Sequence, residues 1–244
     1  SMPNLSVVAV SLKKTRSSAM NPHETASHLA DLLDAQCYLI AAPALTDSAA
    51  TRDGLMGQAM LKEVFDKGAK VDVAFLSVGE LTASNTMLSV GLISADDVRS
   101  LEKAGAVGNI CVYWIDDLGR IVDHPLNARV MAIRPERLTS IPCVILASGG
   151  LSKIPSIHGA LHAGMVDVVV TDGFSGNIAL KTAEGTVKLV TGYLREALRA
   201  SWRGRLGYAI ARPAIDVMRK RIDPRRYNGA ILVGLNGIVV KSHG

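Results

Sequence analysis

Apolar and β-branched residues occur in short runs along residues 5–171, and segments with helical periodicity separate these runs. Several runs are apolar at nearly every position, which is typical of strands covered on both faces in a parallel sheet. We therefore predict strands over Leu5–Val10, Cys37–Ile40, Val71–Leu76, Asn109–Trp114, Val144–Ala147 and Val166–Thr171.

The segments between the predicted strands carry apolar residues three and four positions apart, as amphipathic helices do. Helices are predicted from Asn21 or His23 onward, over Asp53–Lys67 without a break, over Ala95–Ala104 and over Ile154–His162. Ser94 is suited to cap the third of these helices with its hydroxyl group. The alternation of strands and helices predicts a wound α/β fold.

The pattern changes after Asp172. One long helix is predicted over Asn177–Leu198. An arginine-rich segment interrupted by Pro213 follows over Trp202–Arg221, and then a glycine-interrupted, strand-like stretch over Gly229–Val240. Residues 1–172 hold 14 Lys and Arg against 18 Asp and Glu, whereas residues 173–244 hold 13 against 4. The net charges of −4 and +9 predict that the C-terminal part presents a basic surface to an anion.

Composition favours a globular protein, because 48% of the residues are hydrophobic and 20% are charged. Cys37, Cys111 and Cys143 are widely spaced and form no Cys-x-x-Cys pair, which argues against a zinc site and for reduced, buried thiols. The chain shows no signal-peptide pattern and no apolar run long enough to span a bilayer. We therefore expect a cytoplasmic protein with no metal.

A series of motifs follows in order from Ala42 to Asp172. They are Ala42-Pro43-Ala44 with Thr51-Arg52-Asp53, Asp72–Gly79, Gly105–Ile110, Asp116–Arg120, Ser148-Gly149-Gly150 with Lys153, and Gly164–Asp172. With them, residues 5–172 resemble the effector-binding domain of SorC/DeoR-type bacterial transcription regulators. The resemblance implies a Rossmann-like, three-layer parallel sheet, similar to glucosamine-6-phosphate deaminase and ribose-5-phosphate isomerase. It also implies a phosphorylated sugar as ligand, and we expect no direct DNA contact because strand-like sequence begins at Leu5.

A second series of motifs runs to the end of the chain: Val166–Thr182, Ala211-Arg212-Pro213, Ile222–Ala230 and Leu235–Gly244. These motifs resemble the C-terminal part of bacterial phosphate acyltransferases of the PlsX type. The two resemblances overlap at Val166–Asp172, and a natural fusion and an engineered chimera both remain open. We expect a sugar-phosphate-binding domain over residues 1–172. Residues 173–244 are expected to form a helical hairpin that completes or extends the same sheet.

Binding a sugar phosphate requires cationic groups and unpaired backbone N–H groups, and parallel sheets place ligands at the ends of their strands. Arg52 offers a planar fork to phosphate oxygens, and Lys153 follows a Gly-Gly turn at a strand end. The complete set of predicted ligand-binding residues is Lys13, Thr15, Arg52, Ser77, Gly79, Asp116, Gly149, Gly150 and Lys153.

Several of these residues have a second interpretation. Arg52 is also placed to cap a helix or pair with Asp53, Lys153 to lie on a solvated surface, and Asp116 to begin a turn. The loop Ser11–Ser17 carries two lysines where the regulator family usually has glycines, which adopt positive φ angles cheaply. Those lysines either supply charge to a phosphate or mark a lost or altered effector site.

In the second segment, the resemblance implies a phosphate site and transfer of an acyl group from acyl carrier protein to phosphate, with no metal or covalent cofactor. The predicted phosphate-binding residues are Gly176, Asn177, Lys181, Asn236, Lys241 and His243. Gly176 and Asn177 lead into a helix, whose N-terminal N–H groups bind anions, while Lys181 also fits a plain helix surface. Catalysis is not the leading expectation, because the acyl-donor site belongs to a part of such enzymes that has no counterpart here.

Residues 206–221 combine apolar and basic positions, and they resemble the hairpin by which PlsX-type enzymes form dimers and touch membranes. We favour a homodimer or higher oligomer over peripheral membrane contact, and nucleic-acid binding is weakly supported because aromatic residues are few. The leading hypothesis is a non-catalytic sugar-phosphate effector domain with an oligomerising tail. A phosphate acyltransferase, or an inactive fragment of one, is the alternative.

Overall fold

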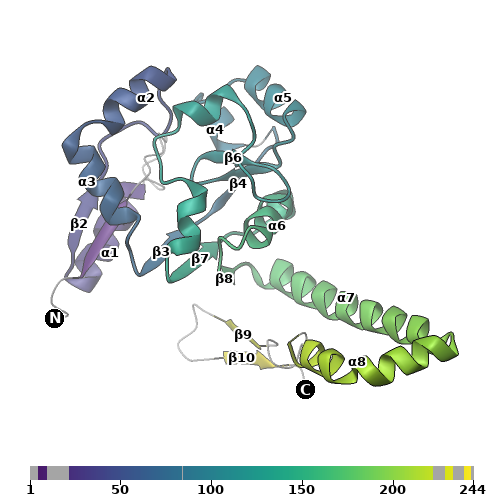
Figure 1. Ribbon diagram of the computed structural model, residues 1–244. Coiled ribbons are helices and arrows are strands. Elements are labelled where there is room, and N and C mark those ends of the chain that lie inside the picture. The colour runs from purple at the N-terminus through teal and green to yellow at the C-terminus, as the bar shows by residue number, and fades with distance from the viewer. Residues whose placement is uncertain (1–4, 10–21, 84, 222–228, 233–238, 243–244) are drawn as a thin grey trace. The chain divides into compact units, whose positions relative to one another are not determined.

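A computed structural model describes residues 5–9, 22–83, 85–221, 229–232 and 239–242. The chain forms two compact units, Ser1–Thr171 and Asp172–Gly244. The first unit is a mixed α/β structure and the second is mostly helical (Figure 1). The strands and helices of the two units follow the predicted order closely, and the differences are described below.

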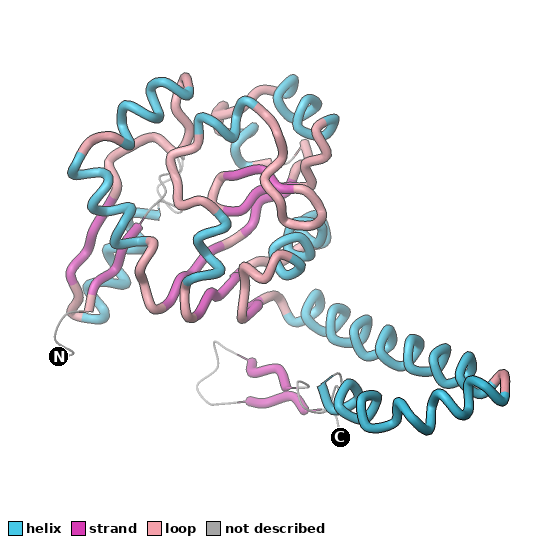
Figure 2. Tube along the Cα trace, in the orientation of Figure 1, coloured by secondary structure: helices cyan, strands magenta, loops and turns pink. Residues whose placement is uncertain are grey.

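Five strands of the first unit pair in parallel, as the apolar runs predict. Strands β1 (Ser6–Ala9) and β2 (Gln36–Leu39) form one pair. Strands β3 (Val73–Leu76), β7 (Cys143–Ala147) and β8 (Val168–Val170) form a sheet in the order β3-β7-β8, shown in magenta in Figure 2. The α/β class with parallel sheets is therefore confirmed.

The single strand predicted over Asn109–Trp114 is wrong. The chain instead turns back at Cys111 and Val112, with φ angles of 49° and 72°, between β5 (Gly108–Ile110) and β6 (Tyr113–Ile115). Together with β4 (Val78–Glu80) they form an antiparallel sheet in the order β4-β5-β6. A two-residue turn with two positive φ angles usually contains glycine or asparagine. Cys111 and Val112 are neither, so the sequence gives no signal of this turn.

The described residues of the first unit form six α-helices: α1 (Pro22–Leu33), α2 (Ala49–Met56), α3 (Ala59–Gly68), α4 (Thr86–Ser89), α5 (Ala95–Lys103) and α6 (Ile154–His162). The unbroken helix predicted over Asp53–Lys67 is wrong, because α2 ends at Met56 and Gln58 is extended, with ψ 125°. The 3₁₀ turns Pro125–Arg129, Pro135–Ser140 and Leu151–Lys153 join later elements.

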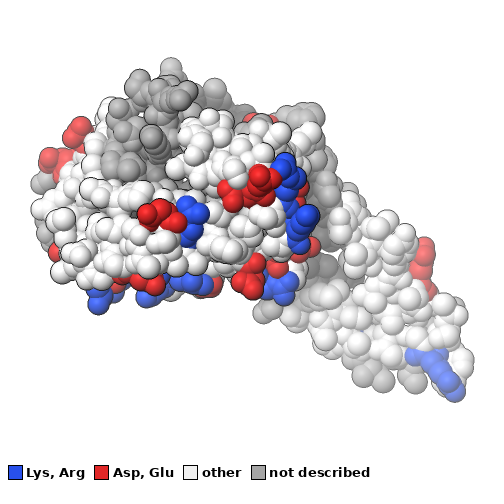
Figure 3. Space-filling view, turned by 90° about the horizontal axis from the view of Figure 1, so that it is seen from above, with Lys and Arg blue, Asp and Glu red and all other residues white. Residues whose placement is uncertain are grey.

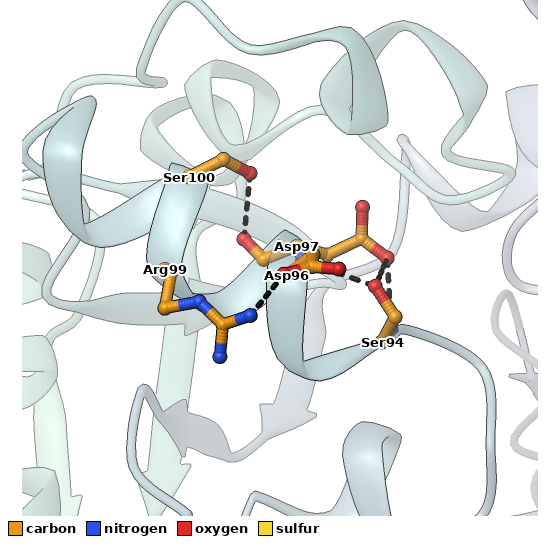
Figure 4. Close-up of polar contacts among 5 residues, drawn as sticks. All are labelled: Ser94, Asp96, Asp97, Arg99 and Ser100. Carbon is orange, nitrogen blue, oxygen red and sulfur yellow. Dashed lines mark hydrogen bonds and ion pairs between the residues drawn. The ribbon is translucent and has the colours of Figure 1, made fainter.

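The predicted cap of α5 is confirmed and is reciprocal (Figure 4). The hydroxyl of Ser94 accepts a hydrogen bond from the N–H of Asp97 at 3.1 Å, and the Asp97 carboxylate accepts one from the N–H of Ser94 at 2.8 Å. This capping box satisfies two N–H groups that have no partner within the helix. Asp96 forms an ion pair with Arg99 one turn further along the helix.

Three apolar clusters form the core of the first unit. The first surrounds the β5–β6 hairpin with α4 and α5 and includes Trp114 and Leu101, both 0% exposed. The second joins β3, β7 and α6, and the third packs α3 against residues that follow β2. Cys111 packs against both the first and second clusters, and burial raises the pKa of its thiol to about 12. Cys37 is exposed on β2, so its predicted burial is wrong.

The second unit contains the helices α7 (Gly173–Arg199) and α8 (Trp202–Arg221), which contact each other, and the antiparallel strands β9 (Gly229–Leu232) and β10 (Val239–Ser242). The long helix α7 is predicted from the sequence, but it begins four residues before the expected Asn177. Among the described residues, no helix is long and apolar enough to cross a membrane.

Candidate functional site

The carboxyl ends of β3, β7 and β8 meet at one edge of the parallel sheet. Leu76 and Leu146 are partners in the register of β3 and β7, so Ser77 and Ser148 follow neighbouring strand ends. The N–H of Ser148 donates to the carbonyl of Val170 at 2.9 Å, which ties the loop after β7 to the end of β8. The edge thus gathers predicted ligand residues from distant motifs, as expected for a parallel sheet.

The loop after β7 carries an unpaired polar group. Ser148 is 8% exposed, and its buried hydroxyl has no hydrogen-bond partner among the described residues. Gly150 has φ 97°, a conformation that glycine adopts without strain. Buried hydroxyl groups are nearly always hydrogen-bonded, so the Ser148 hydroxyl is a candidate contact for a ligand.

Lys153 lies four residues after Gly149, at the start of α6. It ends the 3₁₀ turn that begins after Gly150, and its N–H donates to the Gly150 carbonyl at 3.2 Å. Lys153 also occupies the cap position of α6 and forms no ion pair with another described residue. A lysine next to a helix N-terminus adds its charge to the positive end of the helix dipole, and both favour an anion.

Strand β4 contacts the 3₁₀ turn Leu151–Lys153 and α6, which both lie at this edge. A Cβ atom on Gly79 would collide with the side-chain amide of Asn109 on β5, so only glycine fits there. The hydroxyl of Ser156 in α6 donates to the Gly79 carbonyl at 2.9 Å, and that of Ser152 donates to the Glu80 carboxylate. The predicted residues Ser77, Gly79, Gly149, Gly150 and Lys153 are thus brought to one edge.

Asn109, Ser152 and Ser156 join this edge although the sequence interpretation assigned them no role. Asn109 is 6% exposed and contacts the Gly79 position across the β4–β5 pair. The only sequence signal for Asn109 was its place in Gly105–Ile110, one of the motifs that carry the family resemblance, and this position does not follow a predicted strand. Pairing across an antiparallel ladder decides this contact, and such pairing is not encoded in local spacing.

Arg52 lies elsewhere, on α2. Its Nη1 atom is 2.7 Å from Oδ1 of Asp53, the pairing that the sequence left open as an alternative. This hydrogen bond to Asp53 raises the pKa of Arg52, which keeps the guanidinium charged. Tyr113 of β6, in the first core cluster, also contributes to raising the pKa of Arg52.

Asp116 has the turn role that was its alternative. Its Oδ1 atom accepts the N–H groups of Leu118 at 3.0 Å and Arg120 at 2.9 Å, and Oδ2 is 2.7 Å from Nη2 of Arg120. Burial alone would raise the pKa of Asp116, but the hydrogen bonds from Arg120 and Leu118 outweigh it and lower that pKa. A sugar would have to displace these partners, so binding of sugar hydroxyls by Asp116 stays a prediction.

The remaining predicted residues belong to parts that the structure describes less fully. Lys13, Thr15, Asn236 and His243 lie outside the described residues, and Asn177, Lys181 and Lys241 are described only as backbone positions in α7 and β10. The N–H of Gly176 donates to the Asp172 carbonyl at 2.9 Å. Because α7 begins at Gly173, the N–H groups that lack a carbonyl partner within the helix are those of residues 173–175 and not that of Gly176.

Comparison with known proteins identifies the family of the larger part of the chain. Residues 1–178 match the sequence model of the family described as "Putative sugar-binding domain". The chain belongs to this sugar-binding domain family. Residues 158–244 also match a model described as "Fatty acid synthesis protein", so the two matches overlap across β8 and the start of α7. Both resemblances noted in the sequence are therefore confirmed.

Solved structures share the fold of the sugar-binding domain. A DeoR family transcriptional regulator from Listeria monocytogenes aligns with a TM-score of 0.64 and 24% identity, over 68% of this chain and 66% of that one. The full-length sorbitol operon regulator SorC from Klebsiella pneumoniae aligns with a TM-score of 0.65 and 22% identity, over 71% of this chain and 57% of that one.

Curated relatives are named for the other match. The phosphate acyltransferase of Xanthobacter autotrophicus is 65% identical over 169 residues, which cover 67% of this chain and 47% of the relative. The chain spans about half the length of the curated relatives it matches.

Proposed function

We propose that the first unit binds a phosphorylated sugar at the carboxyl edge of β3-β7-β8 and serves as the effector domain of a transcription regulator. The observation that carries this proposal is the buried hydroxyl of Ser148, which has no partner among the described residues and lies next to the Gly149-Gly150 turn, five residues before Lys153. An unpaired buried hydroxyl, an unpaired lysine and a helix N-terminus converge where parallel sheets hold ligands. Membership in a sugar-binding family agrees with this chemistry.

Each residue of the edge has a proposed role. Lys153 and the N-terminus of α6 attract the phosphate group, and Ser77, Gly79, Gly149 and Gly150 let the ligand approach the backbone. Lys13 and Thr15 are proposed to complete the phosphate contacts from the loop after β1. We also propose the finer fold, a three-layer sheet similar to glucosamine-6-phosphate deaminase and ribose-5-phosphate isomerase. Arg52 is left out of this site, because Asp53 holds its side chain, whereas sugar binding by Asp116 would require displacement of Arg120 and stays a prediction.

The test is the melting temperature measured with a panel of phosphosugars and the matching unphosphorylated sugars. A ligand at about 100 times its Kd stabilises a protein by about 2.7 kcal/mol, which raises Tm by roughly 5–10 °C for a domain of this size. Lys153→Ala should abolish the shift, while Lys103→Ala, on an exposed position of α5, should retain it. The proposal fails if no phosphosugar shifts Tm, or if Lys153→Ala behaves as the wild type does.

The second candidate function is that of a phosphate acyltransferase. It is favoured by the match of residues 158–244 and by the names of the curated relatives. Acyl-phosphate formation from an acyl carrier protein donor would establish it. Because the chain spans about half of such relatives, we expect no product above a control without protein.

We further propose that the second unit forms a hairpin that oligomerises. On α7, Leu189, Val190 and Tyr193 are 55%, 53% and 63% exposed, although apolar side chains on one helix usually contact something. An oligomer is preferred to membrane contact, which anionic vesicles would test separately. Light scattering should give a mass above the 25.8 kDa monomer, and Tyr193→Glu should lower it. A wild-type monomer would contradict the proposal.

A further inference from the structure

Two histidines share one exposed side of α6. His158 and His162 are four residues apart, so their side chains are neighbours on consecutive turns of the helix. Their ring centroids are 6.1 Å apart, and the planes of the two rings differ by 37°. Both residues are exposed, so an ion reaches them from solution without any movement of the core.

One hydrogen bond determines which nitrogen of His158 is available. Its Nδ1 atom lies 3.1 Å from the carbonyl oxygen of Asp117. A carbonyl oxygen only accepts hydrogen bonds, so Nδ1 carries a proton and donates it. In the neutral ring, Nε2 then holds a lone pair that is free to bind a metal ion. Metal-binding histidines are oriented in this way, because their second nitrogen almost always donates to a carbonyl, a carboxylate or water.

The turn that accepts this hydrogen bond is packed directly against α6. A Cβ atom on Gly159 would lie 2.8 Å from the carbonyl oxygen of Asp116, and one on Gly119 would lie 2.3 Å from the carbonyl oxygen of Gly159. Only glycine fits at both positions, so the helix and the turn meet backbone to backbone. This contact holds the Asp117 carbonyl in place beside the His158 ring.

The electrostatic setting favours a cation. His162 is the last residue of α6, and the C-terminal end of a helix carries a partial negative charge. In the neighbouring turn, Asp116 pairs with Arg120 at 2.7 Å and so offsets its positive charge. The carboxylate of Asp117 forms no ion pair with another described residue, so it adds negative charge to this end of the helix.

We propose that His158 and His162 form a binding site for a divalent transition-metal ion at the C-terminal end of α6. Imidazole nitrogens suit ions such as Zn²⁺, Cu²⁺ and Ni²⁺, whereas Mg²⁺ and Ca²⁺ require oxygen ligands. Two imidazoles on one ion have ring centres roughly 5 Å apart, given metal–nitrogen bonds of about 2.1 Å. Small side-chain rotations therefore bring the present pair onto an ion.

The site has two protein ligands. Among the residues that the structure describes, no third histidine, cysteine or carboxylate completes the group, so water molecules fill the remaining positions. The sequence expectation of no metal considered only the cysteines and overlooked this pair. The site does not depend on the sugar-phosphate site at the carboxyl edge.

The experiment is a calorimetric titration of the protein, without an added histidine tag, with Ni²⁺. This ion is chosen because the exposed thiol of Cys37 prefers softer ions such as Zn²⁺. We expect saturable binding that His158→Ala and His162→Ala each weaken by at least about tenfold, since each removes one of two protein ligands. The control is His28→Ala, which removes an exposed histidine of α1 with no histidine four residues away and should leave binding unchanged.

A conservative variant separates metal binding from the hydrogen bond to Asp117. His158→Gln keeps an N–H donor for that carbonyl but supplies no imidazole. It should lose Ni²⁺ binding as His158→Ala does, while it keeps the parent Tm without metal. With Ni²⁺ in excess, Tm should rise for the parent and not for His162→Ala.

Three results would overturn the proposal: no saturable binding of Ni²⁺, binding by both alanine variants as strong as that of the parent, or an equal loss in His28→Ala. Unchanged Ni²⁺ binding by Lys153→Ala would support a site that is independent of the sugar phosphate.

Discussion

The two units bury their helices to different extents. In the first unit, α5 directs Val98 and Leu101 into a core cluster, and its N-terminus is closed by a capping box. In the second unit, α7 is three times as long, yet Leu189, Val190 and Tyr193 are more than half exposed. Helical length alone therefore says little about stability, because most of the stability of a helix comes from packing of its apolar face. The first unit contains its own core, whereas these apolar side chains of α7 lie exposed.

Charged side chains on the surface of the first unit contribute little to its stability. Acidic and basic side chains of the first unit are mixed on the face seen in Figure 3, and several form pairs such as Arg134 with Glu136. Such exposed pairs add little stability, typically below about 1 kcal/mol each. The first unit therefore depends on its apolar clusters, and the following substitutions test that dependence.

The largest expected effect comes from one leucine in each unit. Leu101 is 0% exposed on α5, and Leu189 is 55% exposed on α7. Leu101→Ala leaves a cavity and should lower the free energy of unfolding of the first unit by about 2–5 kcal/mol. Leu189→Ala, in the second unit, should change the free energy of unfolding of the first unit by less than about 0.5 kcal/mol, the usual range for sites outside a core. Denaturant unfolding followed by tryptophan fluorescence measures both, and equal effects would remove the contrast.

A smaller effect is expected at the cap of α5. Ser94→Ala removes the hydroxyl that accepts from the N–H of Asp97, which should cost about 1 kcal/mol. Ser89→Ala is the control, since that hydroxyl, on α4, donates only to a carbonyl within its own helix. If the cap stabilises α5, the denaturation midpoint of Ser94→Ala should be lower than that of Ser89→Ala.

The smallest effect is a pH dependence of the same cap. The hydrogen bond from the N–H of Ser94, helped by its hydroxyl, lowers the pKa of Asp97 in the folded protein below the ordinary 3.8. Because the folded pKa lies below the unfolded one, the stabilisation is complete above about pH 4 and is lost as pH falls through the folded pKa. When the pH is lowered from about 5 to strongly acidic values, the Asp97→Asn protein should therefore lose less stability than the parent protein. Identical acid profiles would contradict this role for Asp97.

Much of the fold was predictable from the sequence. Helix α6 has the predicted bounds, and Ser94 caps α5, because caps and apolar spacing act within a few residues. Two errors have a common cause. The β5–β6 turn places Cys111 and Val112 at positive φ without a glycine or asparagine, and the break between α2 and α3 places Gln58 in an extended conformation, so neither follows from the local apolar spacing.

The candidate site was predictable to the same extent. Ser77, Gly79, Gly149, Gly150 and Lys153 were found because motifs at strand ends mark the edge of a parallel sheet. Asn109 was not found, because its contact with Gly79 depends on which strands lie side by side. Arg52 illustrates the difference, since its residue type indicated an anion but its side chain pairs with Asp53 on α2.

By itself, the sequence determined the α/β class, the order of most elements, the change of character after Asp172, and the resemblances to a sugar-binding domain family and to phosphate acyltransferases. Apolar spacing, capping residues and family motifs are properties of short segments, so they can be interpreted without coordinates. Only the tertiary structure decided which polar groups are buried without a partner and which predicted ligand residues share one edge. Burial and pairing depend on residues far apart in the chain, as the contact of Gly79 with Asn109 shows.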